Sequence, residues 1–272
     1  MKKGQVTIFI VIGAIILIVS GIIFFYKFYW QKANFEQQQE ALANIPSQFL
    51  PVETIVQSCF EDTAEQAVKH VALHGGYFNP KPAMTVIIND TAELSEFLEA
   101  PGEGEEHLFE VFDNRKISVG YWYFKGQGRI PPLRFIESQI SFYVKEYLSL
   151  CLGDLVLTNT NFIYNYENIN ISAETRITNK DVVIKLHYPL GVSSKGFNYL
   201  VQDKKVNVPI NFIGLYDSSK LIVNKIIEKP RMIPLTYLST LNYNVSIYPN
   251  EDDIAYGVTD GETTLMFGNK IV

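Results

Sequence analysis

The sequence has few charged residues and almost no cysteine. Charged residues make up 19% of the 272 positions, and 2 residues are cysteines. Lysine and arginine number 23 against 29 aspartates and glutamates, a formal net charge of −6. Because no basic excess is available to neutralise phosphates, the composition argues against a nucleic-acid partner. Two cysteines are too few for a disulfide-dense scaffold or a thiolate metal cage, and a hydrophobic share of 47% excludes intrinsic disorder.

The short motifs that accompany common catalytic sites are also missing. The sequence contains no GxSxG, SxxK, HExxH or GxGxxG pattern, and its GQG at 126–128 is not followed by GK[ST]. We therefore expect no catalytic residue, no cofactor, no metal and no enzymatic activity. An envelope enzyme, or a subunit of a membrane complex, stays open as a further alternative, because catalytic groups are recognised by geometry rather than by sequence order.

A long uncharged run lies near the start of the sequence. Residues 6–26 (VTIFIVIGAIILIVSGIIFFY) contain no charged side chain. As a helix, this run is about 30 Å long, enough to cross the hydrocarbon core of a bilayer. Aromatic residues crowd its distal end, as at a membrane interface. The run predicts one transmembrane helix, and residues 27–45, without glycine or proline, can continue it as a stalk.

The flanks of this run favour a cytoplasmic N-terminus and an extracellular remainder. Lys2, Lys3 and the terminal amine precede the span, which gives a slight preference under the positive-inside rule. Three sequons follow the span, at Asn89, Asn170 and Asn244, and are possible glycosylation sites on an exported chain. The expected location is therefore the cell membrane, with a single pass and most of the chain outside.

The residues that open the chain carry a resemblance. Lys2-Lys3-Gly4-Gln5, followed directly by the apolar run, resembles the class III signal of archaeal type IV pilin-like proteins. The resemblance implies that a prepilin peptidase cuts between Gly4 and Gln5 and removes a leader of residues 1–4. Pilins of this kind usually carry glutamate at the fifth mature position, which helps to register subunits in a filament. That position here is Phe9, which weighs against filament assembly.

Later stretches resemble the membrane-anchored surface proteins of small-genome archaea, which are mostly uncharacterised. The stretches are Cys59 through Tyr77, GYWYF at 120–124, IESQISFYVKEYLSLC at 136–151 and DVVIKLHYPL at 181–190. Their order along the chain carries the resemblance more than any one of them does. It implies a location and an architecture rather than an activity.

Hydrophobic periodicity predicts an α+β fold for the remainder. Apolar stripes at helical spacing predict helices over 51–74, 136–152 and 215–228. Strands are expected over 84–88, 116–124, 206–212, 242–248, 254–259 and 263–267, with further strand-like runs in 160–189. Pro209 indicates a sheet edge for the strand that contains it.

The expected organisation of the chain has four parts. They are a possible leader at 1–4, a transmembrane and stalk helix at 5–45, an α-rich segment with short strands at 46–152, and a β-rich, mostly antiparallel exported domain with one helix at 153–272.

The two cysteines lie on the apolar stripes of two predicted helices. If those stripes pack together, Cys59 and Cys151 can meet and form a disulfide, which requires an oxidising exterior. The alternative is a pair of buried free thiols. The predicted topology favours the disulfide.

Two further groups of residues have both a functional and a structural interpretation. Tyr121, Trp122, Tyr123 and the nearby Arg129 are a possible binding edge for sugars or a partner protein, but alternation along a strand would bury such aromatic side chains in a core. His70 and His74 have the helical spacing of a metal-binding pair. No third ligand accompanies them, and histidine near a helix C-terminus is favoured electrostatically, so we expect no metal site there.

These observations predict a non-enzymatic, membrane-anchored surface protein that presents an exported interaction or adhesion domain. Its expected partners are the bilayer, through the N-terminal helix, and envelope glycans or surface proteins. The alternative is a pilin-like subunit that self-assembles into a type IV pilus-related filament.

Overall fold

The computed structural model describes residues 19, 45–78, 108–113, 115–158, 162–165, 171–230, 232–250 and 253–270. By internal contacts the chain divides into two compact units, Met1–Val52 and Glu53–Val272. Among the described residues, no helix combines the length and the apolar character needed to cross a membrane. The predicted leader site at Gly4 and Gln5, most of the apolar run, the predicted strand at 84–88 and the sequons at Asn89 and Asn170 lie outside the described residues.

The three predicted helices are present. A 3-10 turn at Ser47–Phe49 leads into α2, which spans Leu50–Leu73, and α5 spans Phe212–Glu228. The predicted helix at 136–152 is longer at both ends, because α4 spans Leu133–Thr158. A short helix, α6, follows at Leu235–Leu238. The apolar stripes therefore located these helices, although the ends of α4 lie beyond its periodic segment and α5 begins at Phe212, which was predicted to end a strand.

Two glycines end α2 as the sequence predicts. The amide of Gly76 donates to the carbonyl of Val71 at 2.8 Å, and the amide of Gly75 donates to that of Ala72 at 3.1 Å. This is the Schellman arrangement, which needs positive φ, and Gly75 and Gly76 have φ of 74° and 94°. A Cβ on Gly75 would lie 3.1–3.3 Å from backbone atoms of two strands. The glycines thus let the helix end close to a sheet.

The largest sheet has six strands and mixes early and late parts of the chain. Its order is β1-β2-β12-β11-β10, with β3 paired to β2. The strands are β1 (Leu108–Asp113), β2 (Arg115–Phe124), β3 (Gln127–Gly128), β10 (Asn244–Asn250), β11 (Asp253–Asp260) and β12 (Thr263–Lys270). Only the β2–β12 pair in this sheet is parallel. Strand β2, which precedes residue 152, therefore shares a sheet with strands from the predicted β-rich segment.

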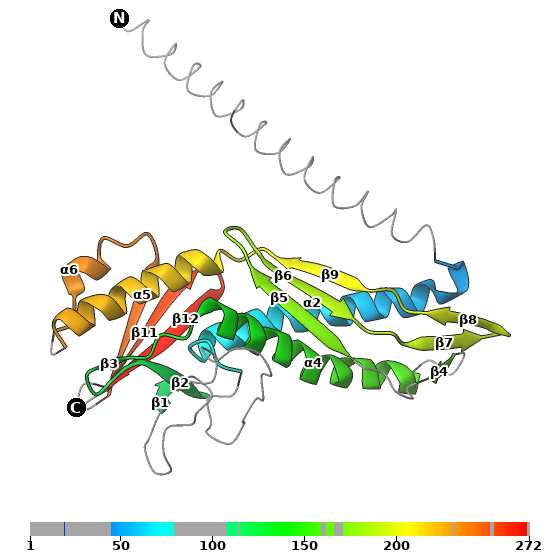
Figure 1. The fold of residues 1–272 in the computed structure, drawn as a ribbon, viewed down its shortest axis with the longest axis horizontal. Coiled ribbons are helices and arrows are strands. Elements are labelled where there is room, and N and C mark those ends of the chain that lie inside the picture. Colours follow the sequence, from blue (N-terminus) through cyan, green and yellow to red (C-terminus); the bar gives the residue numbers. More distant parts are fainter. Residues whose placement is uncertain are drawn as a thin grey trace, which may run out of the picture. The chain divides into compact units, whose positions relative to one another are not determined.

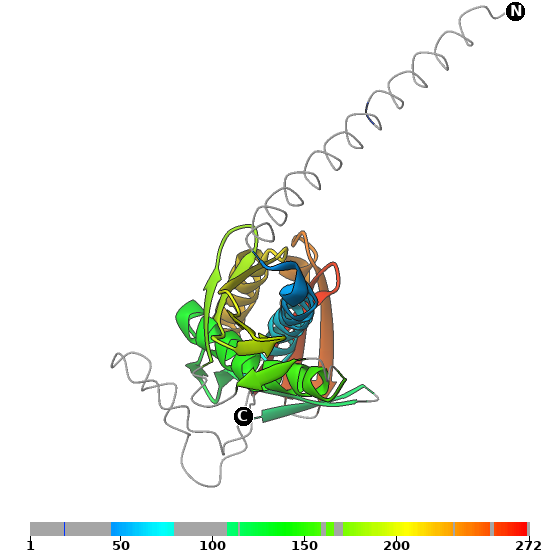
Figure 2. The same ribbon diagram turned by 90° about the vertical axis from the view of Figure 1, so that its right-hand side faces the viewer.

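Two three-stranded antiparallel sheets complete the described fold, which is α+β (Figure 1). One has the order β4-β7-β8 and the other β5-β6-β9. The strands are β4 (Ile163–Asn165), β7 (Gly191–Ser194), β8 (Phe197–Leu200), β5 (Ser172–Ile177), β6 (Val182–His187) and β9 (Lys204–Val208). Strand β9 is at an edge, as Pro209 predicted, and the proline follows its last residue. In both ribbon views, β5 lies beside α4 (Figures 1 and 2).

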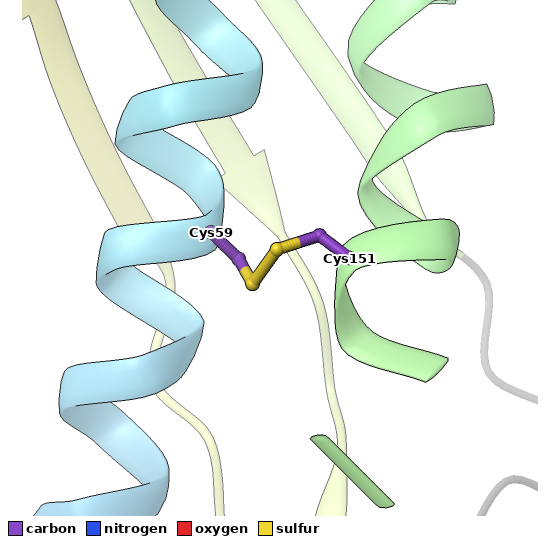
Figure 3. Close-up of a disulfide and its surroundings, with 2 residues drawn as sticks. All are labelled: Cys59 and Cys151. Carbon is purple, nitrogen blue, oxygen red and sulfur yellow. A yellow bond between two sulfur atoms is a disulfide. The ribbon is translucent and has the colours of Figure 1, made fainter. Parts of the chain in front are cut away.

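A disulfide joins the two long helices, as predicted. Cys59 of α2 and Cys151 of α4 point toward one another and are bonded, with their Cα atoms 5.9 Å apart (Figure 3). The bond closes a loop of 92 positions along the chain. Closing so long a loop stabilises the fold by about 4–5 kcal/mol in the chain-entropy account.

An aromatic stack holds α5 to the large sheet. The rings of Trp122 (β2) and Phe267 (β12) are stacked with centroids 5.0 Å apart, and Tyr256 (β11) stacks on Phe267 at 5.5 Å. Tyr216 of α5 meets Trp122 edge-on at 5.7 Å. The Trp122 indole N–H donates to the carbonyl of Gly75 at 2.9 Å, so the polar atom of the largest buried side chain is paired.

Candidate functional site

The aromatic residues of the sequence GYWYF lie in the core. Tyr121, Trp122 and Tyr123 are 5%, 0% and 3% exposed. Their burial corrects the hypothesis that they form a binding edge and favours the packing alternative. Both faces of β2 are covered, so alternation along the strand leaves none of the three at the surface. Arg129 is half-buried, with its guanidinium 4.9 Å from the centroid of the Phe124 ring.

His70 and His74 pack on each other at the end of α2. Their rings are stacked with centroids 4.1 Å apart, and Tyr143 of α4 lies 5.0 Å from the His70 ring. His70 Nε2 is 2.9 Å from the carbonyl oxygen of Phe78, and His74 Nδ1 is 2.8 Å from that of His70. Since a carbonyl only accepts, each of these nitrogens carries a proton. Burial lowers the pKa of both histidines below 6.5, which favours the neutral rings.

This histidine pair has no third ligand among the described residues. No group of three or more histidine, cysteine, aspartate or glutamate side chains within them is placed to hold a metal ion. The stacked rings instead belong to an aromatic cluster between α2 and α4. Its other members are Phe78, Phe142, Tyr143 and Tyr147.

A buried ion pair ties the start of α2 to the smaller sheets. Glu53 is 1% exposed and its carboxylate accepts hydrogen bonds from the Tyr199 hydroxyl, the Gln202 amide and the Lys204 ammonium. The Gln202 contact is 3.2 Å long. Burial lowers the pKa of Lys204 to about 8. With three donors on one carboxylate, this network is closed to a ligand, and we assign it a structural role.

A small cavity lies between the C-terminal end of α5 and the large sheet. It measures about 20 Å³ and has room for a group of one or two heavy atoms. Its walls come from α5, from the connection that follows α5 and from strands β11 and β12. The lining residues are Ile226, Pro230, Met232, Ile233, Ile254, Tyr256 and Asn269. We call it the Asn269 cavity.

Asn269 is the polar residue that distinguishes this cavity. It is 1% exposed, and neither its amide nitrogen nor its amide oxygen has a hydrogen-bond partner among the described residues. A buried polar group without a partner costs about 1–3 kcal/mol, so native proteins contain few of them. An unpaired buried carboxamide beside a cavity is therefore an unusual feature of this part of the fold.

The backbone is irregular at the same residue. In the parallel pairing of β12 with β2, the register shifts between Gly268 and Asn269. Such irregularities re-aim a side chain and occur often beside functional sites. Asn269 thus combines an irregular backbone with an unpaired side chain.

The entrance to the cavity is apolar and open to solvent. Met232 is 61% exposed and Ile233 is 37% exposed, and both line the cavity. Tyr256 is buried at its wall, and burial raises the pKa of its phenol to about 12, so the ring stays uncharged. No lining residue carries a charge. The lining is therefore uncharged, and the two amide atoms of Asn269 are themselves buried.

Sequence reasoning did not identify Asn269. The strand predicted at 263–267 ended three residues too early, since β12 continues to Lys270. Extending the alternation of Leu265 and Phe267 by two residues places Asn269 on the same side of the strand. The signal that was available is an asparagine that follows Leu265 and Phe267 at the same spacing.

Of the three sequons, the structure describes the one at Asn244. This residue is exposed and is the first residue of β10, an end strand in the described order of the large sheet.

The chain matches no family model, no curated protein and no solved structure. The function is therefore inferred from the residues and their geometry.

Proposed function

We propose that this chain is a membrane-anchored cell-surface protein whose exported α+β body binds other surface molecules without catalysis. The uncharged run at residues 6–26 supports the anchor, because a helix of that length spans a bilayer. In this proposal the N-terminus is cytoplasmic and the body is extracellular. The partners are the bilayer, through the anchor, and envelope glycans or surface proteins, through the body.

The observation that carries the proposal is the disulfide between Cys59 and Cys151. Disulfides form and persist in oxidising compartments and are rare in the cytosol of most organisms, so the bond supports export. Exposed apolar side chains support a binding role. Met232 and Leu235, which lie close together in the chain, are 61% and 63% exposed, and exposed apolar groups of this kind mark interaction sites when they form a patch.

The anchor and the oxidised state are tested on the full-length chain in its own membranes. After an alkaline carbonate wash, the chain is expected to stay in the membrane pellet. Rapid alkylation of intact cells is expected to leave Cys59 and Cys151 unmodified until a reductant is added. Release by the carbonate wash would contradict the anchor, and alkylation of both thiols before reduction would contradict export into an oxidising compartment.

A second candidate function is a pilin-like filament subunit, favoured by Gly4-Gln5 directly before the apolar run. Mass spectrometry of the N-terminal peptide, from sheared surface material and separately from membranes, discriminates the two. A mature start at Gln5 in the sheared fraction supports the filament subunit. A chain found only in membranes supports the anchored surface protein.

A further inference from the structure

We propose that the side chains of Lys204 and Glu53 condense into an isopeptide bond, which crosslinks the first residue of β9 to the first turn of α2. The Nζ of Lys204 becomes the amide nitrogen, and the Cδ of Glu53 becomes the carbonyl carbon. Two residues that are 151 positions apart in the sequence are then covalently joined. The ion pair described above is the state from which this bond forms.

The two reacting groups are in contact at a buried site. The ammonium of Lys204 donates to Oε2 of Glu53. The side chain of Glu53 is 1% exposed and that of Lys204 is 11% exposed, so water has little access to either. Groups held together in this way react as if one of them were present at about 10⁵–10⁸ M. Burial and contact therefore favour condensation, which water opposes at an exposed pair.

The other oxygen of the carboxylate is held as an oxyanion is held in acyl transfer. Oε1 of Glu53 accepts from the Tyr199 hydroxyl and from the Gln202 backbone amide, the latter at 3.2 Å. Two donors on one oxygen stabilise the negative charge that collects there when a nucleophile attacks the carbonyl carbon. Oε2, which faces Lys204, is the oxygen that departs. The two oxygens of Glu53 thus have the different surroundings that the reaction requires.

The condensation needs no oxidant and no cofactor. One ammonium proton passes from Lys204 to Oε2 of Glu53, which leaves a neutral amine beside a carboxylic acid. The lone pair of Nζ forms a bond to Cδ, and negative charge moves onto Oε1. A second proton then passes from Nζ to Oε2, the Cδ–Oε2 bond breaks, and one water leaves. Burial lowers the pKa of Lys204 to about 8, which favours the neutral amine that attacks.

The bond lies where a pull on the anchor reaches the body. Glu53 is the first residue of the compact unit Glu53–Val272. A covalent bond from Glu53 to Lys204 passes that force directly to β9, without unfolding the chain between the two residues. This consequence rests on the proposed function, whereas the bond itself does not depend on the anchor or on export.

The test is peptide mass spectrometry of the full-length chain, purified in detergent micelles, reduced, alkylated and digested with trypsin. Trypsin does not cleave after an acylated lysine, so one branched peptide is expected, which joins residues 33–69 to residues 196–205. It should be lighter than its two parts by one water, about 18 Da. Cleavage after Lys69, whose exposed pair with Glu65 measures 2.8 Å, is the internal control for a pair that stays ionic. An unbranched peptide of residues 196–204 in place of the branched one overturns the proposal.

Variants test the arrangement around the carboxylate. Tyr199→Phe removes one donor to Oε1 and should slow the appearance of the branched peptide about 10²-fold after cell-free synthesis in micelles. Tyr237→Phe, on α6 and outside this network, is the matched control and should leave the rate unchanged. Lys204→Arg keeps the positive charge but forms no crosslink, because the guanidinium stays protonated.

The disulfide shows that each variant has folded, since Cys59 and Cys151 then resist alkylation until a reductant is added. Equal rates in Tyr199→Phe and Tyr237→Phe would overturn the role of Oε1 in the reaction. A water loss that persists in Lys204→Arg would place the crosslink elsewhere and overturn the assignment to Lys204. None of these outcomes bears on the anchor or on export, which the carbonate wash and the alkylation of intact cells test separately.

Discussion

Asn269 lies directly opposite Ile254 in the antiparallel register of β12 and β11, so a buried carboxamide faces an aliphatic neighbour instead of a hydrogen-bond partner. Replacing this carboxamide with a leucine removes the unpaired polar atoms. Asn269→Leu is therefore expected to raise the free energy of unfolding by about 1–3 kcal/mol, measured by urea denaturation. The control is Asn207→Leu, at an exposed position of β9, with a change of about 0.5 kcal/mol or less. A loss of stability in Asn269→Leu would mean that the carboxamide already has a partner.

The disulfide is expected to supply much of the stability of the body. Cys59→Ser and Cys151→Ser, alone or together, should lower the free energy of unfolding by about 4–5 kcal/mol, because each change opens the same long loop. Denaturation with and without reductant measures this directly. Reductant should destabilise the unaltered chain and leave the double variant unchanged. Equal stability of the reduced and oxidised chains would contradict the predicted contribution.

Removing the charge of Glu53 is expected to lower the free energy of unfolding strongly, because its buried partner Lys204 remains. Glu53→Gln leaves the ammonium of Lys204, whose side chain is 11% exposed, without its charged partner. The expected loss in the free energy of unfolding is about 3–5 kcal/mol. Glu65→Gln, which breaks the exposed pair with Lys69, is the matched control and should cost about 0.5 kcal/mol or less. Comparable losses in the two variants would show that burial does not set the energy of the Glu53 pair.

The stacked histidines predict a pH dependence with a definite direction. Because burial lowers the pKa of His70 and His74 below 6.5, the unfolded chain binds protons more readily than the folded chain as the solution becomes acidic. The stability these groups contribute is therefore present above pH 6.5 and is lost as the pH falls through the lowered folded-state values. Unfolding free energies measured across this interval should decline with pH, and His70→Gln/His74→Gln should flatten the decline. An identical slope in the double variant would assign the effect to other groups.

Much of the fold could be predicted from periodicity, because the stripes of the helices coincide with buried faces. Cys59 and Cys151 could be paired for the same reason, since each lies on the apolar stripe of its helix. The β7–β8 hairpin was missed. Its turn places Lys195 at φ 49° and Gly196 at φ 83°, and only the glycine signals such a turn in the sequence.

The candidate site was largely invisible in the sequence. Tyr121, Trp122 and Tyr123 attracted attention as aromatic residues, but tertiary packing on both faces of β2 buries all three. The Asn269 cavity joins α5 to two strands that follow it in the chain, and the lack of a partner for one carboxamide depends on distances that no local pattern encodes. Composition and spacing therefore suggested a surface protein, while the position of the cavity required the folded structure.

The most direct test of the account is labelling of intact cells with a membrane-impermeant, lysine-reactive reagent, followed by peptide mass spectrometry. Lys185, Lys195, Lys205 and Lys220 are exposed on the body of the protein. All four are expected to be labelled in intact cells, whereas Lys2 and Lys3, if still present, should be labelled only after the cells are permeabilised. Labelling of the four body lysines only after permeabilisation would contradict the central claim that the body lies outside the cell.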